Sequence, residues 1–81
     1  MQVYLMHFPQ YRKYENEKVY FKIVQPELWT EIQYLGSQRI EKSFQVQTFN
    51  DRNFVQDLLS CNTGIKICTE LEFLNFYNAL N

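Results

Sequence analysis

The sequence contains few of the residues that most often carry chemistry. It has one histidine, two cysteines and two glycines among 81 residues, and its formal net charge is −1. A charge this balanced creates no long-range field for polyanions or acidic membranes. Two cysteines are too few for the disulfide framework of a small secreted domain. Two glycines also exclude the glycine-rich loops that bind phosphate groups.

Long apolar segments are absent as well. The apolar run Met1–Phe8 is only eight residues long and follows no basic segment. A signal peptide or a membrane span needs a longer apolar stretch. We therefore expect a cytoplasmic protein with reduced thiols and no contact with a membrane.

Aromatic side chains are abundant, with seven Phe, six Tyr and one Trp making 17% of the chain. Each buried ring removes about 150–250 Å² from water, which helps a short chain to build a core. No linker, repeat or biased segment interrupts the sequence. We predict a single domain over residues 1–81.

Hydrophobic periodicity predicts strands in the first third of the chain. Met1–Phe8 is apolar on both faces, which is typical of a central strand. Residues 9–16 are polar and predict an exposed loop, and Lys18–Val24 alternates as a half-buried strand does. The predicted inward side chains are Val19, Phe21 and Ile23, and the predicted outward ones are Lys18, Tyr20 and Lys22.

Residues 28–35 fit two structures. Pro26 and the spacing of the leucines are compatible with a short helix ended by Gly36. A hairpin with a type II′ turn at Gly36-Ser37 explains more of the sequence, because the turn then aligns complementary side chains across the strands. These pairs are Tyr34 with Arg39, Glu31 with Lys42, Thr30 with Ser43 and Trp29 with Phe44. We predict the hairpin.

Two helices are expected in the second half. Asn50-Asp51 offers an N-cap to a helix that carries Phe54, Val55, Leu58 and Leu59 at helical spacing and ends at Asn62-Thr63-Gly64. A short strand, Ile65–Cys68, follows. Thr69 and Glu72 form a capping box that begins a last helix reaching about Leu80.

The predicted element order is β-β-β-β-α-β-α, an α+β fold. We expect a mainly antiparallel sheet of four to five strands with both helices packed on one face.

Catalytic groupings are not evident in the sequence. No Ser, Cys or Asp lies at the spacing from His7 that a known catalytic motif would require. Cys61 and Cys68 lack the further cysteine or histidine ligands of a zinc site. The paired glutamates are interpreted as charged surface. We expect no enzymatic activity, no metal and no cofactor.

One basic and aromatic segment is compatible with binding to single-stranded RNA or DNA. Tyrosine rings can stack on unpaired bases while lysine and arginine contact phosphates. A solvated sheet face is the alternative interpretation. The candidate nucleic-acid contacts are Tyr11, Arg12, Lys13, Tyr14, Lys18, Tyr20 and Lys22.

The last helix has apolar side chains around more than half of its circumference, which is more than one sheet contact requires. The surplus is either core or an interface for a larger protein or a second copy of the chain. The candidate partner contacts are Phe73, Phe76, Tyr77 and Leu80.

The segment from Lys18 to Asn81 resembles a class of small phage and mobile-element proteins. The resemblance rests on aromatic-rich strands followed by Ile65-Lys66-Ile67-Cys68-Thr69-Glu70-Leu71-Glu72-Phe73, an isoleucine strand that leads into a capped helix. Some proteins of this build inhibit bacterial defence systems, and anti-CRISPR proteins are among them. The resemblance implies a non-catalytic inhibitor that occupies a surface of a host protein such as a CRISPR effector, with contact to a guide RNA compatible with this role. A small virion or assembly component is a further hypothesis.

Overall fold

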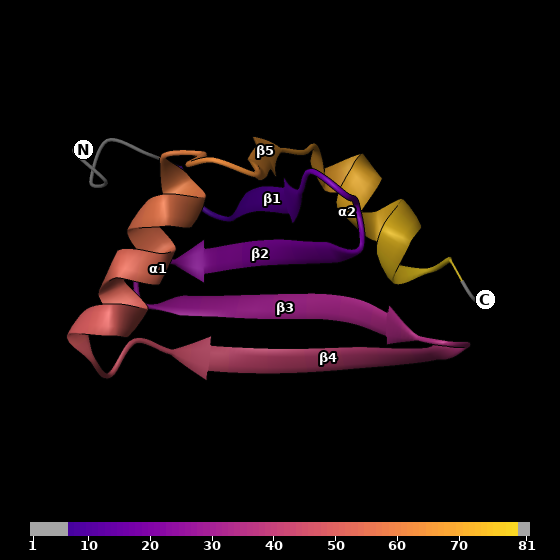
Figure 1. The fold of residues 1–81 in the computed structure, drawn as a ribbon, viewed down its shortest axis with the longest axis horizontal. Helices are drawn as coiled ribbons and strands as arrows, with labels where there is room; N and C mark the ends of the chain where they lie inside the picture. Colours follow the sequence, from indigo (N-terminus) through magenta and orange to yellow (C-terminus); the bar gives the residue numbers. More distant parts are fainter. Residues whose placement is uncertain (1–6, 80–81) are drawn as a thin grey trace.

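The computed structural model describes residues 7–79, in which five strands form one sheet and two helices pack against it (Figure 1). The sheet order is β4-β3-β2-β1-β5, and all neighbouring strands are antiparallel. The predicted α+β class is confirmed. The elements are β1 (Gln10–Tyr14), β2 (Val19–Gln25), β3 (Leu28–Leu35), β4 (Gln38–Gln45), α1 (Phe49–Leu59), β5 (Ile65–Ile67) and α2 (Glu70–Tyr77).

The first described strand lies where the sequence predicted a loop. β1 spans Gln10–Tyr14 and is paired on both sides, with β2 and β5. In the predicted strand Met1–Phe8, residues 1–6 lie outside the described part of the chain, and His7 and Phe8 precede β1 without belonging to a strand. The prediction failed because β1 buries polar-tipped side chains, which no apolar alternation marks.

The β3–β4 hairpin was predicted correctly. Its register pairs Trp29 with Phe44 and Glu31 with Lys42, and the Thr30 and Ser43 hydroxyls lie 3.1 Å apart. Gly36 has φ +63° whereas Ser37 does not have a positive φ, which is the pattern of a type II′ turn. The turn residues and the cross-strand pairs were therefore sufficient to predict this hairpin and its register.

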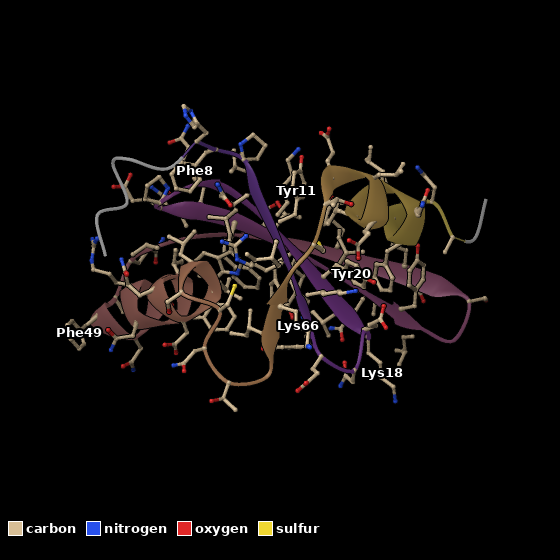
Figure 2. All side chains as sticks on the ribbon, turned by 90° about the horizontal axis from the view of Figure 1, so that it is seen from above. Phe8, Tyr11, Lys18, Tyr20, Phe49 and Lys66 are labelled. Carbon is tan, nitrogen blue, oxygen red and sulfur yellow. The ribbon has the colours of Figure 1, made fainter. Side chains whose placement is uncertain are left out.

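The two helices cover opposite faces of the sheet, not one face as predicted. Phe21 of β2 packs in one cluster with Val55 and Leu58 of α1, whereas its neighbour Tyr20 packs in a second cluster with Phe73 of α2. Successive strand residues point to opposite faces, so the helices must lie on different sides. Figure 2, turned by 90° from Figure 1, shows α1 and α2 on the two sides of the strands. We call these sides the α1 face and the α2 face.

Both helices begin with a capping box. α2 has the predicted box, with Thr69 as N-cap and Glu72 at the third position. α1 begins earlier than predicted, because Thr48 and Asp51 form its box and Asn50 is already helical. Each box satisfies backbone N–H groups that have no partner inside the helix. The capped start of α2 fixes where this helix meets the sheet.

Candidate functional site

Aromatic stacking holds α2 on the sheet. Phe76 stacks on Tyr20 with ring centroids 4.0 Å apart, and Phe73 lies 5.2 Å from the Tyr11 ring. The single O–H of Tyr34 is shared between the last two carbonyls of α2, with oxygen–oxygen distances of 2.6 Å to Phe76 and 2.9 Å to Tyr77. These contacts satisfy acceptors at a helix end and fix the orientation of α2.

α2 is too short to cover its whole face of the sheet. Tyr20 of β2 is 6% exposed under the helix, whereas Val24, on the same face of the same strand, is 37% exposed. Thr30 of β3 lies in the same uncovered half, next to Lys22. Part of the α2 face is therefore open.

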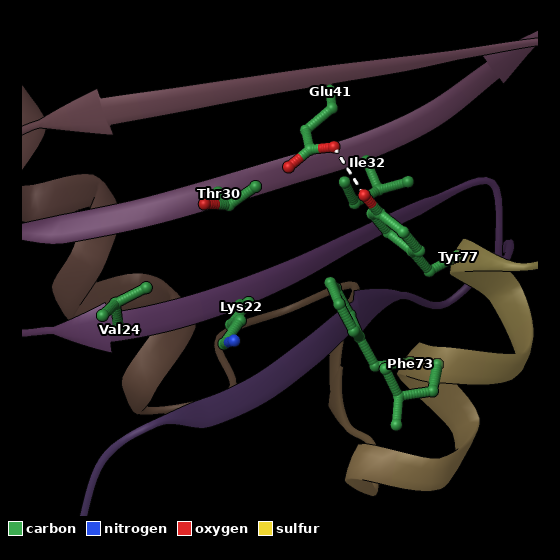
Figure 3. A pocket seen from close by; sticks show the side chains of 8 residues that line it. Lys22, Val24, Thr30, Ile32, Glu41, Phe73 and Tyr77 are labelled. Carbon is green, nitrogen blue, oxygen red and sulfur yellow. Dashed lines mark hydrogen bonds between the residues drawn. The ribbon is translucent and has the colours of Figure 1, made fainter.

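A groove of about 250 Å³ lies at the boundary between α2 and this open half (Figure 3). Buried Ile32 and Phe73 contribute apolar surface, and Leu74 of α2 lines the groove as well. Figure 3 shows Phe73 and Tyr77 reaching from α2 toward β3, with Lys22 and Val24 further along β2. The complete lining is Lys22, Val24, Thr30, Ile32, Glu41, Phe73, Leu74 and Tyr77.

The groove carries one charge of each sign. Glu41 accepts a hydrogen bond from the Tyr77 hydroxyl at 3.0 Å, and Figure 3 marks this bond. The ammonium group of Lys22 has no hydrogen bond or ion pair to any of the residues 7–79. A bound group would thus meet an apolar floor with a free ammonium on one side and a carboxylate on the other.

The exposed apolar side chains of α2 adjoin the groove. Leu71 is 67% exposed and Leu74 is 43% exposed, and residues three apart lie on the same side of a helix. Leu74 and Val24 both line the groove, and Leu71 lies one turn before Leu74 on α2. We call these three exposed side chains the Leu71–Leu74–Val24 strip. Both leucines belong to the apolar circumference predicted for the last helix, but they were not among the predicted partner contacts.

The predicted partner contacts lie mostly on the inner side of α2. Phe73 is 5% exposed and belongs to the core, and Phe76 and Tyr77 are half-buried against the sheet. Leu80 lies outside the described residues. The core interpretation therefore holds for Phe73, and the accessible apolar surface of α2 is Leu71 and Leu74 instead.

The predicted nucleic-acid contacts do not form one accessible patch. Tyr11, Arg12 and Tyr20 are buried, so their side chains cannot stack on bases or meet phosphates in this conformation. Tyr14 packs edge-on against Phe21 on the α1 face, whereas Lys13 lies on the other face. Lys18 is exposed in the turn before β2, and Lys22 lines the groove.

Lys13 is neutralised within the protein. Its ammonium group lies 3.0 Å from Glu72 and 3.1 Å from Glu17. These hydrogen bonds, that to Glu72 first, raise the pKa of Lys13 above its ordinary value. The partner Glu72 has a pKa below its ordinary value, chiefly because Lys13 donates to it and also because it caps α2. A lysine paired with two carboxylates is a poor phosphate ligand.

Arg12 has a structural role that the sequence did not reveal. Its side chain is 3% exposed and lies on the α1 face. Its Nε donates a hydrogen bond to the Leu58 carbonyl at 2.8 Å, and its Nη2 donates one to the Leu59 carbonyl at 3.2 Å. These carbonyls belong to the last turn of α1, which has no basic residue of its own. Arg12 therefore caps α1 from β1 and places positive charge at the negative end of the helix dipole.

The remaining candidates for chemistry stand apart from one another. His7 is exposed, and its carbonyl accepts a hydrogen bond from Gln10. Burial raises the pKa of the Cys68 thiol to about 11, while Cys61 is half-buried elsewhere as a free cysteine. Within residues 7–79, no three His, Cys, Asp or Glu side chains are grouped so that they could hold a metal ion.

Neither helix of the described residues has the length and apolar character needed to cross a bilayer. Comparison of the chain with protein-family models, curated proteins and solved structures gave no significant match.

Proposed function

We propose that this protein is a non-catalytic binding protein that acts by occupying a surface of a larger host protein. The observation that carries the proposal is the Leu71–Leu74–Val24 strip beside a groove with one free cation and one carboxylate. Exposed apolar side chains rimmed by polar groups are typical of protein interaction sites. The expected partner presents an apolar segment flanked by charged groups.

The partner class follows from the phage-type resemblance of the chain. We propose an inhibitor of a bacterial defence protein in the cytoplasm of the host cell, with a CRISPR effector as the first partner to test. A small protein can block a large effector without catalysis, provided that it binds where the effector must bind something else. Leu71 and Leu74 are the proposed central contacts, with Lys22 and Glu41 at the rim.

A plasmid-interference assay against a panel of CRISPR effectors tests this function. Co-expression of the wild-type chain should protect the targeted plasmid from at least one effector. The double variant Leu71→Lys/Leu74→Lys should lose the protection, because two ammonium groups would be buried at the contact. Both leucines are exposed, so the variant should fold with nearly unchanged stability.

Ile67→Lys is the matched control. Ile67 is 67% exposed, as Leu71 is, but belongs to edge strand β5 and lies away from the strip. This variant should protect as well as the wild type. Equal loss of protection in both variants would contradict the assignment to the strip, and a lack of protection against the entire panel would reject the CRISPR partner.

Gel shifts and particle sizing test the two other sequence hypotheses. Binding to single-stranded oligonucleotides that weakens steeply with salt would favour the nucleic-acid function. Large defined particles in light scattering would favour a virion component. We expect no oligonucleotide binding of this kind, because three of the seven proposed nucleic-acid contacts are buried and the chain carries nearly balanced charges.

A further inference from the structure

Strand β4 forms a long edge of the sheet, and Tyr77 at the end of α2 contacts two of its side chains. Seven of its eight residues are exposed, and only Ile40 is half-buried. Its register with β3 runs from Leu28–Gln45 to Leu35–Gln38 without a bulge. The opposite edge, β5, has only three residues. A long and regular edge can pair with another strand unless it is protected.

The free backbone groups of β4 can be assigned from the hairpin. Residues that flank a two-residue turn form a hydrogen-bonded pair, and such pairs alternate along an antiparallel ladder. The hydrogen bond from Val46 N–H to the Glu27 carbonyl, at 2.8 Å, agrees with this alternation. The N–H and C=O groups of Arg39, Glu41 and Ser43 therefore point away from β3.

The side chains of β4 discriminate between the two-fold pairings that these groups allow. A two-fold axis at Arg39, Glu41 or Lys42 places like charges directly opposite each other, which is destabilising. A two-fold axis at Ser43 pairs no positively charged side chain with a negatively charged one. An axis at Ile40 pairs Arg39 with Glu41 of the second copy, twice, and places the two Ile40 side chains opposite each other. In this register Lys42 faces Gln38 of the second copy.

The two charged side chains lie on the same face of β4, beside Tyr77 of α2. Arg39 donates to the Tyr77 carbonyl at 2.8 Å and lies 3.9 Å from the Tyr77 ring, and Glu41 accepts from the Tyr77 hydroxyl. Neither Arg39 nor Glu41 has an ion-pair partner among residues 7–79. A second copy would supply that partner to both.

We propose that two copies of this chain associate through β4, in antiparallel register about a two-fold axis at Ile40. The result is a continuous ten-stranded sheet. Phe73 and Phe76 of α2 pack on Tyr11 of β1 and Tyr20 of β2, whereas Tyr77, at the end of the helix, reaches Arg39 and Glu41 of β4. This proposal does not depend on the proposed function. The contact is small, and small contacts are typical of weak association, so the dimer should exchange with monomer.

Sedimentation equilibrium with charge-reversed variants tests the pairing. The wild type should show a concentration-dependent monomer–dimer equilibrium. Arg39→Glu alone and Glu41→Arg alone should each weaken it by at least about tenfold, because both cross-strand pairs become repulsive. An equimolar mixture of the two variants should dimerise as the wild type does, because one copy then carries two glutamates and the other two arginines. A merely structural effect of either change on α2 would not be reversed by mixing.

Disulfide trapping tests the register of the proposed pairing between the two β4 strands. In a Cys61→Ser background, Ile40→Cys should form a crosslinked dimer on mild oxidation, because directly opposite residues have Cβ atoms about 4.5–5.5 Å apart. Gln38→Cys and Lys42→Cys should not crosslink to themselves, because each would lie about 14 Å from its copy along the strand. A wild type that is monomeric at its highest soluble concentration, or a mixture that fails to recover dimer, would overturn the proposal. Crosslinking of Gln38→Cys or Lys42→Cys in place of Ile40→Cys would overturn the register.

Discussion

Replacing Arg12 by alanine should destabilise the fold far more than any surface change. The guanidinium group caps two carbonyls at the end of α1 and also bonds to the Tyr11 carbonyl and the Gln10 side chain. Alanine would leave the Leu59 carbonyl without a donor, at about 1–3 kcal/mol for a buried acceptor, and the Leu58 carbonyl, which also accepts from the Cys61 N–H at 3.2 Å, would lose one of its two hydrogen bonds, at about 0.5–1.5 kcal/mol. Loss of the charge at the helix end adds about 0.3–1 kcal/mol.

The expected sum is a loss of about 2–5 kcal/mol in the free energy of unfolding. A domain of 81 residues has a total of about 4–12 kcal/mol at the usual value per residue, so this single change removes a large share. Arg12→Lys keeps the charge but has one nitrogen in place of a planar fork, so we expect a loss of intermediate size.

Urea unfolding followed by circular dichroism measures these losses. Arg52→Ala is the matched control, because Arg52 is an exposed residue of α1 with no side-chain partner among residues 7–79, and its change should stay within about 0.5 kcal/mol. If Arg12→Ala falls within about 1 kcal/mol of Arg52→Ala, the capping role of Arg12 is refuted.

Two further predictions concern titratable groups. The pKa of Asp51 is lowered chiefly by the Gln47 N–H bond and that of Glu72 chiefly by Lys13. Their stabilisation is therefore complete above the ordinary pKa values, 3.8 for Asp51 and 4.5 for Glu72, and is lost as the pH falls through the lowered pKa values. Unfolding midpoints should decline on acidification, and Asp51→Asn/Glu72→Gln should flatten this decline whereas Glu27→Gln should not. Iodoacetamide should alkylate half-buried Cys61 and spare Cys68 under native conditions, because Cys68 is buried and its pKa is about 11, and mass spectrometry should find both modified in urea. Rapid native alkylation of Cys68 would contradict its burial.

The correct predictions came from interactions between residues close in sequence. The hairpin followed from a turn and cross-strand pairs such as Glu31 with Lys42, and the α2 cap followed from Thr69 and Glu72. Each of these interactions lies within a short segment of the chain, so the residues that form it can be recognised from that segment alone. The helical spacing of α1 was visible for the same reason.

The errors concern contacts between distant parts of the chain. β1 was missed because Arg12 is stabilised by carbonyls 46 and 47 residues away, which local periodicity cannot reveal. The one-face arrangement was wrong because Tyr20 was assigned to solvent as a polar-tipped residue, whereas its ring provides the platform for Phe76. The same error hid the groove, which exists only because α2 covers half of that face.

The most direct test of the proposed function is the affinity of the purified protein for the effector that it protects against. Isothermal titration should give at least about thirtyfold weaker binding for Leu71→Lys/Leu74→Lys than for the wild type, which is the loss expected at a central contact. Ile67→Lys should bind as the wild type does. Equal affinities for the wild type and the double leucine variant would contradict the assignment of the binding surface to α2.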